Sequence, residues 1–252
     1  MAEALDVEFD PRLRIILAAD VANQAELDHL IEVFGLELDW FKFGIMTQGY
    51  FGGPQVLKRL VEEELQVMAD LKLHDVPYIM AGAAAAAAAQ GAKFITAHAS
   101  AGVEALKAVI EVKGQAQILG VTVLTSLDEK ECRRIYGTSV EKTVLRLADN
   151  ARQAGCDGLV CAPHELKLLR RYRRFDRLIK VTPNIRPAWA ATGDQNRQRS
   201  MTPAEAVAHG ADYLVIGRPL THPPKDVGSP AMALHLICDE MRPALKKRGG
   251  WK

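Results

Sequence analysis

The sequence Asp70-Leu71-Lys72-Leu73-His74-Asp75-Val76-Pro77 directly follows an apolar, strand-like segment, Leu65-Gln66-Val67-Met68-Ala69. Because side chains alternate between the two faces of a strand, Asp70 and Lys72 point to one face and the leucines beside them to the other. The charged pair therefore lies on a face where a strand buried on both sides normally carries apolar residues. We expect pairing to stop around Asp75, because the proline that follows cannot continue a central strand.

This local pattern allows two interpretations. In the first, Asp70 and Lys72 form a structural ion pair, and Asp75 caps the next helix. In the second, the two carboxylates and the ammonium group belong to a functional site, because gathering them at the end of a buried strand is costly. The rest of the chain has to decide between the two.

The composition is that of an ordinary soluble globular protein, with 252 residues, 48% hydrophobic residues and 25% charged residues. The formal net charge of +1 gives no general attraction to nucleic acid, so we expect no nucleic-acid partner and only local anion sites. The four cysteines have no C-x-x-C spacing and favour small core residues over metal ligands. We therefore predict no metal site.

The N-terminal segment Met1–Pro11 is acidic and lacks the basic start and apolar run of a signal peptide. No apolar run reaches membrane-spanning length, and the alanine run Ala83–Ala89 favours the helix of a soluble protein. We expect a reduced, cytoplasmic compartment and no contact with membranes.

Eight strand-like segments alternate with helix-like segments, and no Pro-, Gly- or Ser-rich linker separates two halves. The strands are predicted at residues 14–20, 40–44, 65–73, 94–98, 118–124, 158–161, 178–183 and 213–219. Regular alternation indicates a parallel sheet, and eight units indicate closure into a barrel. We predict an α/β protein with a single (β/α)8 TIM-barrel domain over residues 1–252, with a short N-terminal tail (1–12) and a basic, solvated C-terminal tail (246–252).

In such barrels the chemistry lies at the carboxyl ends of the strands. Polar residues follow most of the predicted strands at this end: Asp20, Lys42, Asp70, Lys72, Asp75, His98, Ser126, Gln195 and Arg218. Their collection at one end of the barrel favours a functional site over solvent exposure. We leave His98 out of the site, because a hydrogen-bonded core histidine is the simpler interpretation.

The loops after strands seven and eight of such barrels often bind phosphate. Gln195 and the pair Gly217-Arg218 fall there. Glycine lets the backbone approach an anion closely, and arginine offers a bidentate guanidinium group. We therefore predict a phosphate-binding site formed by these three residues.

With these residues in place, the chain resembles the orotidine 5′-phosphate decarboxylase family over about residues 14–233. The strongest match is Asp70-x-Lys72-x-x-Asp75 followed by Val76-Pro77, a motif partly shared with related sugar-phosphate decarboxylases and synthases. The supporting matches are Asp20, Lys42, His98-Ala99-Ser100, Leu124-Thr125-Ser126, Val181-Thr182-Pro183-x-Ile185-Arg186-Pro187, Gly193-Asp194-Gln195 and Ile216-Gly217-Arg218-Pro219.

The resemblance implies conversion of orotidine 5′-phosphate to UMP and CO2, the last step of de novo pyrimidine biosynthesis, without a cofactor. It implies that Lys72 stabilises a carbanion at C6 and protonates it, that Asp70 lies against the departing carboxylate, and that Lys42 completes the charge network. It also implies a homodimer in which Asp75 reaches the partner's active site. The substrate-binding residues that it implies are Asp20 for the ribose, Ser126 for the pyrimidine, and Gln195, Gly217 and Arg218 for the phosphate.

Physical chemistry agrees with these implied roles. The C6 electron pair has no cofactor to accept it, so a fixed ammonium group must stabilise it electrostatically. A carboxylate at Asp70 would repel a substrate carboxylate by about 4 kcal/mol at ~4 Å and an effective dielectric constant of ~20. This repulsion disappears as CO2 leaves, and phosphate binding energy can hold the reacting end in place.

The sequence departs from the family pattern in a few places. Tyr78-Ile79 stands where the family usually has Asn-Thr, and Asn184 stands where members have glycine. The loop around Asn196–Arg199 is about two residues longer than expected, and the run Ala83–Ala89 suggests close helix packing, as at a dimer contact. None of these departures touches the four charged residues.

Two alternatives remain open. A 3-keto-gulonate-6-phosphate decarboxylase or hexulose-phosphate synthase would need Mg²⁺ and a further acid near the lysine of the second strand. Phe41 and Phe43 flank Lys42 instead, which disfavours that metal site. A barrel that binds nucleotide without catalysis is the second alternative, and the intact set of charged residues argues against it.

Overall fold

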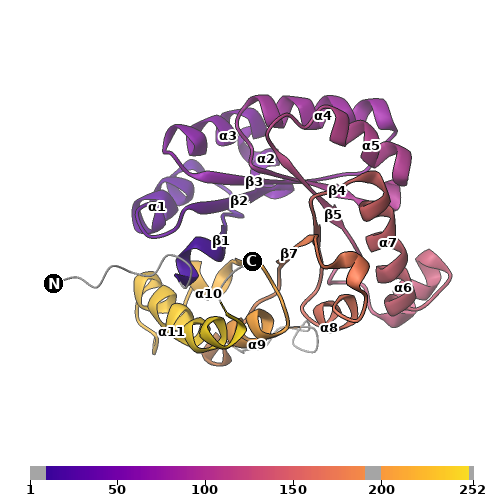
Figure 1. Cartoon of the computed structure of the whole chain (residues 1–252). Helices are drawn as coiled ribbons and strands as arrows, with labels where there is room; N and C mark the ends of the chain where they lie inside the picture. The colour runs from indigo at the N-terminus through magenta and orange to yellow at the C-terminus, as the bar shows by residue number, and fades with distance from the viewer. Residues whose placement is uncertain (1–9, 191–199, 250–252) are drawn as a thin grey trace.

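The computed structural model describes residues 10–190 and 200–249. Eight parallel strands close into a barrel in chain order, and β8 pairs with β1. The strands are β1 (Ile15–Ala18), β2 (Trp40–Gly44), β3 (Gln66–Leu73), β4 (Phe94–His98), β5 (Gln117–Val121), β6 (Gly158–Val160), β7 (Ile179–Thr182) and β8 (Tyr213–Ile216). The predicted (β/α)8 TIM barrel is confirmed (Figure 1).

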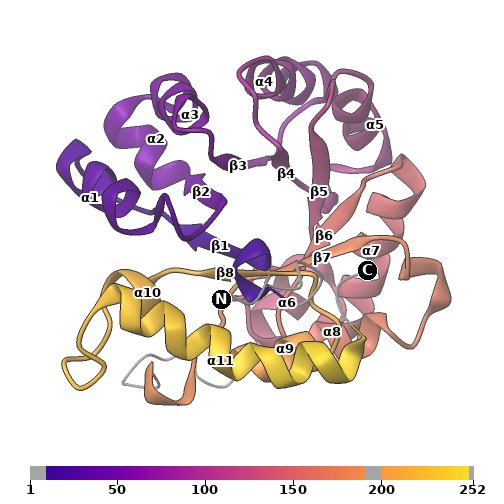
Figure 2. The same cartoon turned by 60° about the vertical axis from the view of Figure 1, so that its left-hand side comes forward.

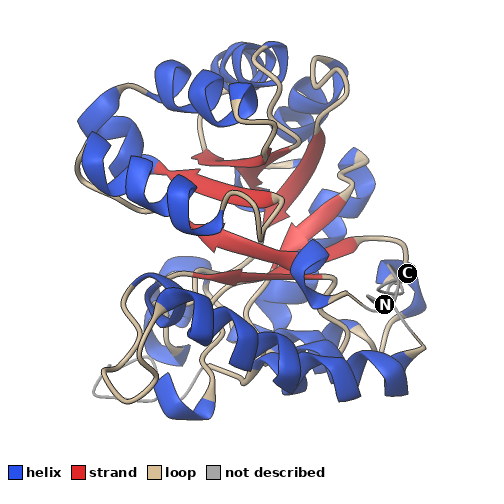
Figure 3. Cartoon of the chain, turned by 90° about the vertical axis from the view of Figure 1, so that its left-hand side faces the viewer, coloured by secondary structure: helices blue, strands red, loops and turns tan. Residues whose placement is uncertain are grey.

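Helices surround the barrel on its outside (Figure 3). They are α1 (Gln24–Phe34), α2 (Ile45–Phe51), α3 (Gly53–Glu62), α4 (Pro77–Ala89), α5 (Val103–Glu111), α6 (Glu129–Tyr136), α7 (Val140–Ala154), α8 (Glu165–Leu169), α9 (Pro203–Ala208), α10 (Arg218–Thr221) and α11 (Pro230–Arg248). Among the described helices, none combines the length and apolar character that a membrane crossing requires.

Local signals account for several helix ends. Thr202 and Glu205 form a capping box at the start of α9, with each side chain bound to the other residue's backbone amide. α1 ends at Gly35. Short α2, α6 and α10 were not predicted, and the predicted strand 213–219 is too long, because β8 ends at Ile216 and α10 begins at Arg218. For α6, Asp128 caps the amide of Glu131 and Gly137 ends the helix in the left-handed conformation.

The two predicted tails are shorter than expected where the structure describes them. Asp10 caps a 3-10 turn, Pro11–Arg14, that leads into β1, so order begins before residue 12. At the other end, α11 continues to Arg248, whose guanidinium group donates to Asp212 at 2.6 Å. Lys246 and Lys247 are exposed, as expected of a solvated basic segment, but they belong to the last turn of α11, and Arg248 is half-buried. Residues 1–9 and 250–252 lie outside the described part.

The alanine run lies in α4, which packs against α5 and the barrel. Ala84 and Ala87 are buried together with Met80, while other alanines of the helix face outward. Small side chains thus allow close packing within the chain. The prediction that the run forms a dimer contact is not tested by this packing.

The barrel interior is divided along its axis. At the amino ends of the strands, three aromatic rings pack together: Trp40 stacks on Phe94 with ring centroids 4.4 Å apart, and Tyr213 meets both rings edge-on at 5.3 and 5.2 Å. Arg14 donates to the Tyr213 hydroxyl from below at 2.6 Å. This aromatic floor closes the barrel beneath the polar residues at the other end.

Candidate active site

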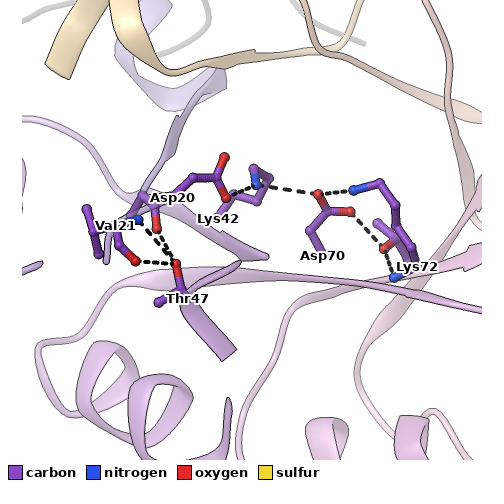
Figure 4. A network of polar contacts seen from close by, with 8 residues as sticks. Asp20, Val21, Lys42, Thr47, Asp70 and Lys72 are labelled. Atoms are coloured by element: carbon purple, nitrogen blue, oxygen red, sulfur yellow. Dashed lines mark hydrogen bonds and ion pairs between the residues drawn. The ribbon is translucent and has the colours of Figure 1, made fainter. Parts of the chain in front are cut away.

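Three neighbouring strands bring the predicted charged residues together. β2 carries Lys42 and β3 carries Asp70, and the pairing sets Gly44 opposite Asp70. The Lys42 ammonium lies 2.8 Å from Oδ1 of Asp20 and 3.4 Å from Oδ2 of Asp70, and the Lys72 ammonium lies 2.6 Å from the same Oδ2 (Figure 4). The four side chains form a row of alternating charge, Asp20–Lys42–Asp70–Lys72.

The centre of this row is buried. Lys42 and Asp70 are 7% and 6% exposed, whereas the side chains of Lys72 and Asp20 are 30% and 46% exposed. Burial alone would raise the pKa of Asp70, but Lys42, Lys72 and hydrogen bonds from Lys72 and Thr96 outweigh it and hold that pKa below its usual value. Asp70 is therefore a carboxylate at neutral pH, and Lys72 offers the more accessible ammonium group.

Thr96 completes the surroundings of Asp70 and was not predicted. Its fully buried hydroxyl donates to Oδ1 of Asp70 at 2.9 Å and accepts the backbone N–H of Lys72 at 2.9 Å. The sequence did contain a signal for this role. Thr96 follows Phe94 by two positions in β4, so both side chains face into the barrel. It fixes the carboxylate and the backbone of Lys72 together.

The strand β3 is irregular where it carries the site. Ala69 pairs with Ile95 of β4, and the next pair is Leu73 with Ala97. Between these pairs β3 contains two more residues than β4, and it accommodates them in a bulge. Within it Lys72 has φ +48°, in the left-handed region that lysine rarely adopts. Such strain typically marks functional sites, where the surrounding contacts hold the backbone.

Thr47, at the start of α2, holds the turn that carries Asp20. Its buried hydroxyl donates to the carbonyl of Ala19 at 2.9 Å and accepts the N–H of Val21 at 3.3 Å (Figure 4). Gly44 leaves room above the row, because a Cβ there would lie 3.1 Å from Oδ1 of Asp20 and 3.2 Å from Nζ of Lys42. Neither role was predicted from the sequence.

A cavity of about 520 Å³ opens over the charged row at the carboxyl ends of the strands. Its lining combines charged groups with many apolar side chains, as in most sites for small organic ligands. The polar lining residues include Asp20, Lys42, Asp70, Lys72, Arg186, Arg218 and His222, and the apolar ones include Val121, Val123, Leu124, Val160, Cys161 and Ile185. Burial raises the pKa of the Cys161 thiol, so this cysteine is no nucleophile at neutral pH.

Two of the three predicted phosphate residues line this cavity. Gly217 directly follows β8 and Arg218 begins α10. Gln195 lies outside the described residues, as does the loop 196–199. Asn184 lines the cavity with φ +62°, a conformation that asparagine tolerates better than most residues.

Two predicted residues do not line the cavity. Ser126 is exposed beyond its wall, which Leu124 and Thr125 form at this point. Asp75 is also exposed, and its carboxylate accepts the N–H of Val76 at 2.7 Å. The alternative interpretation of Asp75 as a helix cap is wrong, because α4 begins after Val76 without any side-chain cap. The roles implied for both residues stay predictions.

His98 sits beside the site without contacting the charged row. Its ring lies 5.2 Å from that of His74, whose Nε2 is 3.3 Å from the Ser100 hydroxyl. Burial, followed by the charges of His74 and Lys72, lowers the pKa of His98 to about 4. The imidazole is therefore neutral at pH 7 and adds no charge to the network.

This geometry agrees with the comparison to known families. The model of the orotidine 5′-phosphate decarboxylase / HUMPS family matches residues 13–230. The chain belongs to this family. Membership covers all eight strands and the whole charged row, and it places the chain among enzymes of the carbon–carbon lyase class, as carboxy-lyases.

Individual relatives support the assignment. The orotidine 5′-phosphate decarboxylase of Geobacter sulfurreducens is 40% identical over 240 residues, covering 91% of this chain and 96% of the relative. The one from Synechococcus sp. WH7803 is 42% identical over 245 residues, covering 92% and 96%. The crystal structure of orotidine 5′-phosphate decarboxylase from Lactobacillus acidophilus has a TM-score of 0.76 at 29% identity, covering 91% of this chain and 99% of that one.

Proposed function

We propose that the chain converts orotidine 5′-phosphate to UMP and CO2, with no metal or organic cofactor. One observation carries the proposal: the Lys72 ammonium lies 2.6 Å from the buried Asp70 carboxylate at the base of a cavity that Arg218 also lines. A cation and an anion are thus held side by side where the reacting carbon of a nucleotide would sit. The enzyme would act in pyrimidine biosynthesis.

The Lys72 ammonium acts on the electron pair that the departing CO2 leaves at C6. As the C–C bond breaks, negative charge develops on C6, and a fixed cation lowers the energy of that state more than the energy of the substrate. Lys72 then transfers a proton to C6 and becomes a neutral amine. A proton from water restores the ammonium group before the next turnover.

Asp70 acts on the substrate carboxylate. Thr96 and both lysines hold Asp70 ionised, so it faces a second carboxylate in the substrate complex and loses this repulsion when CO2 leaves. At an effective dielectric constant of ~20 and ~4 Å, two unit charges repel by about 4 kcal/mol. Phosphate binding at Gly217 and Arg218 supplies the binding energy that opposes this repulsion.

Asp20 provides a carboxylate for the ribose hydroxyls. Its side chain is 46% exposed at the cavity and is oriented by Lys42 and by the turn that Thr47 holds. Lys42 therefore links ribose binding to the charge of Asp70. Gln195 would add an amide to the phosphate site, and Ser126 would contact the pyrimidine.

We further propose that the enzyme is a cytoplasmic homodimer in which Asp75 serves the partner's site. Asp75 lies outside its own cavity, and exposed apolar side chains surround it in the chain: Val76 is 60%, Tyr78 84% and Ile79 51% exposed. Ile79 cannot form the hydroxyl contact that threonine makes in the family. An apolar contact across the interface would replace it.

The test is a spectrophotometric assay with orotidine 5′-phosphate, run with and without EDTA. We expect loss of the orotate absorbance in both conditions and at least a ~10³-fold slower rate in Lys72→Ala, because the ammonium group is lost. Lys130→Ala is the matched control, since Lys130 is an exposed lysine of α6 away from the cavity.

Two results would contradict the proposal. Retained turnover in Lys72→Ala would remove the lysine from the chemistry. Activity that EDTA abolishes and Mg²⁺ restores would favour a metal-dependent sugar-phosphate enzyme instead. Within residues 10–190 and 200–249, no three His, Cys, Asp or Glu side chains cluster as a ligand set for such a metal.

A further inference from the structure

A second cavity, of about 950 Å³, opens at the opposite end of the barrel, around the amino ends of β7 and β8. It lies beneath the aromatic floor, because Tyr213 and Ile179 belong to its lining. The helices α9 and α11 lie side by side along this end, with α8 close by (Figures 1 and 2). None of the residues proposed for decarboxylation lines this cavity.

Positive charge is concentrated in this lower cavity. Two carboxylates, Asp176 and Asp212, face six cationic side chains: Arg14, Arg170, Arg177, Lys180, Lys247 and Arg248. The lining thus has four more positive than negative charges, whereas the formal net charge of the whole chain is only +1. Such an excess is unfavourable in itself, because like charges repel each other unless an anion lies between them.

Three of the cations have no carboxylate partner among the described residues. Arg170, next to the end of α8, donates to the carbonyl of Ala208 at 2.9 Å, which leaves its charge uncompensated. Arg177 and Lys247 are exposed, and no ion pair within the described residues involves either of them. The three groups come from the end of α8, the turn before β7 and the last turn of α11, so the fold itself brings them around one space.

A neighbouring group responds to this positive field. Burial lowers the pKa of His209, and the positive charges of Lys167 and Arg170 lower it further. His209 ends α9 at the rim of the lower cavity, one residue from both Ala208 and Gly210 of the lining. Glu205 acts in the opposite direction, and the net shift of this pKa is downward.

We propose that the lower cavity binds an anion made of a chain of phosphates. Arginine forks bind phosphate oxygens in pairs, and a lysine adds a point charge. A single phosphate would contact only part of so wide a space, whereas a chain of two or three phosphates spans cations that come from separate elements. Both a free polyphosphate and the phosphate chain of a nucleoside triphosphate have this chemistry.

The test is isothermal titration calorimetry of the full chain with inorganic tripolyphosphate. We expect binding to the wild type and at least tenfold weaker binding to the double variant Arg177→Ala/Lys247→Ala. The matched control is Arg173→Ala/Lys246→Ala, which removes two exposed cations that do not line the cavity. Binding should be unchanged in the control and should weaken as salt concentration rises.

A third variant separates the two ends of the barrel. Arg218→Ala removes one cation of the upper cavity, the one assigned to phosphate, and tripolyphosphate binding in the lower one should survive it. Equal affinity in wild type and Arg177→Ala/Lys247→Ala, or loss of binding in Arg218→Ala, would overturn the proposal. These variants change exposed side chains, and far-UV circular dichroism verifies that each remains folded.

Titration with ATP then distinguishes the two sources of the phosphate chain. Tighter binding of ATP than of tripolyphosphate assigns the site to nucleotides, with the base and sugar on the apolar part of the lining. Equal binding assigns it to the phosphate chain alone. Because the readout is binding and not turnover, this result stands apart from the outcome of the decarboxylase assay.

Discussion

The two ends of the barrel interior use the same strands for opposite purposes. β2 carries Trp40 in the aromatic floor and, two residues later, Lys42 in the charged row. β4 does the same with Phe94 and Thr96. One inward step along a strand thus separates a residue that packs from a residue that serves the proposed chemistry.

This difference shows that the floor and the charged row depend on each other. The stacked rings of Trp40 and Phe94 fill the barrel below Asp70 and keep bulk water away from that side. A lower effective dielectric constant strengthens every interaction among the charges above. Changes at the upper end should therefore reduce activity with little effect on folding, and changes at the lower end should do the reverse.

The largest expected effect is that of Asp70→Asn. The variant keeps the size of the side chain but removes the carboxylate that both lysines contact, so we expect the decarboxylation rate to fall about 10³-fold. Steady-state assays measure the rate, and thermal unfolding checks the fold. A variant that keeps more than about a tenth of the activity would remove Asp70 from the proposed mechanism.

The next effect is that of Trp40→Ala in the floor. Loss of the stacked ring should lower the free energy of unfolding by about 3 kcal/mol, the low end for buried aromatic residues, because Trp40 is only partly buried. Urea denaturation measures the loss. The rate per folded molecule should change far less than in Asp70→Asn, and an equal loss of activity would erase the distinction between the two ends.

A third test uses acid. Since the folded protein holds the pKa of Asp70 below its usual value, the ionised carboxylate stabilises the fold fully above the unfolded-state pKa of about 3.9. This stabilisation disappears as pH falls through the lower, folded-state pKa. Between pH 6 and pH 3 the wild type should therefore lose more unfolding free energy than Asp70→Asn, and parallel curves would speak against the assigned shift.

The smallest effect is expected for Tyr213→Phe. The change keeps the ring contacts with Trp40 and Phe94 and removes the hydroxyl that accepts from Arg14 at 2.6 Å. We expect a loss of about 1 kcal/mol, or roughly 2–4 °C in the unfolding temperature for a chain of this size. Differential scanning calorimetry resolves this shift, and unchanged turnover is the matching expectation at the upper end.

The barrel could be predicted because alternation of strands and helices is a strong, repeated signal. The missed helices were short ones, where few residues carry the pattern. For α6 the signal was present in Asp128 and Gly137, which begin and end it. In α2 the sequence Ile45–Phe51 contains Thr47 and Gly49, both weak helix formers, and contact with the Asp20 turn favours the helix instead.

The site could be predicted in its charged row because strand alternation places Lys42, Asp70 and Lys72 on the inner face. The bulge in β3 could not be predicted, since no glycine or proline marks it. Thr96 was missed because a threonine in an apolar strand is also an ordinary strand former. Ser126 belongs to a matched motif, yet its neighbours Leu124 and Thr125 line the cavity and Ser126 does not. A matched motif therefore does not determine which of its residues faces the cavity.

The bulge also has a consequence for hydrogen exchange. The amide of Lys72 donates to the hydroxyl of Thr96, a side chain that itself holds Asp70. Its exchange with deuterium therefore reports whether the carboxylate is in place, independently of the rest of the sheet. A single backbone amide thus provides a natural probe of how well the site is organised before any substrate binds.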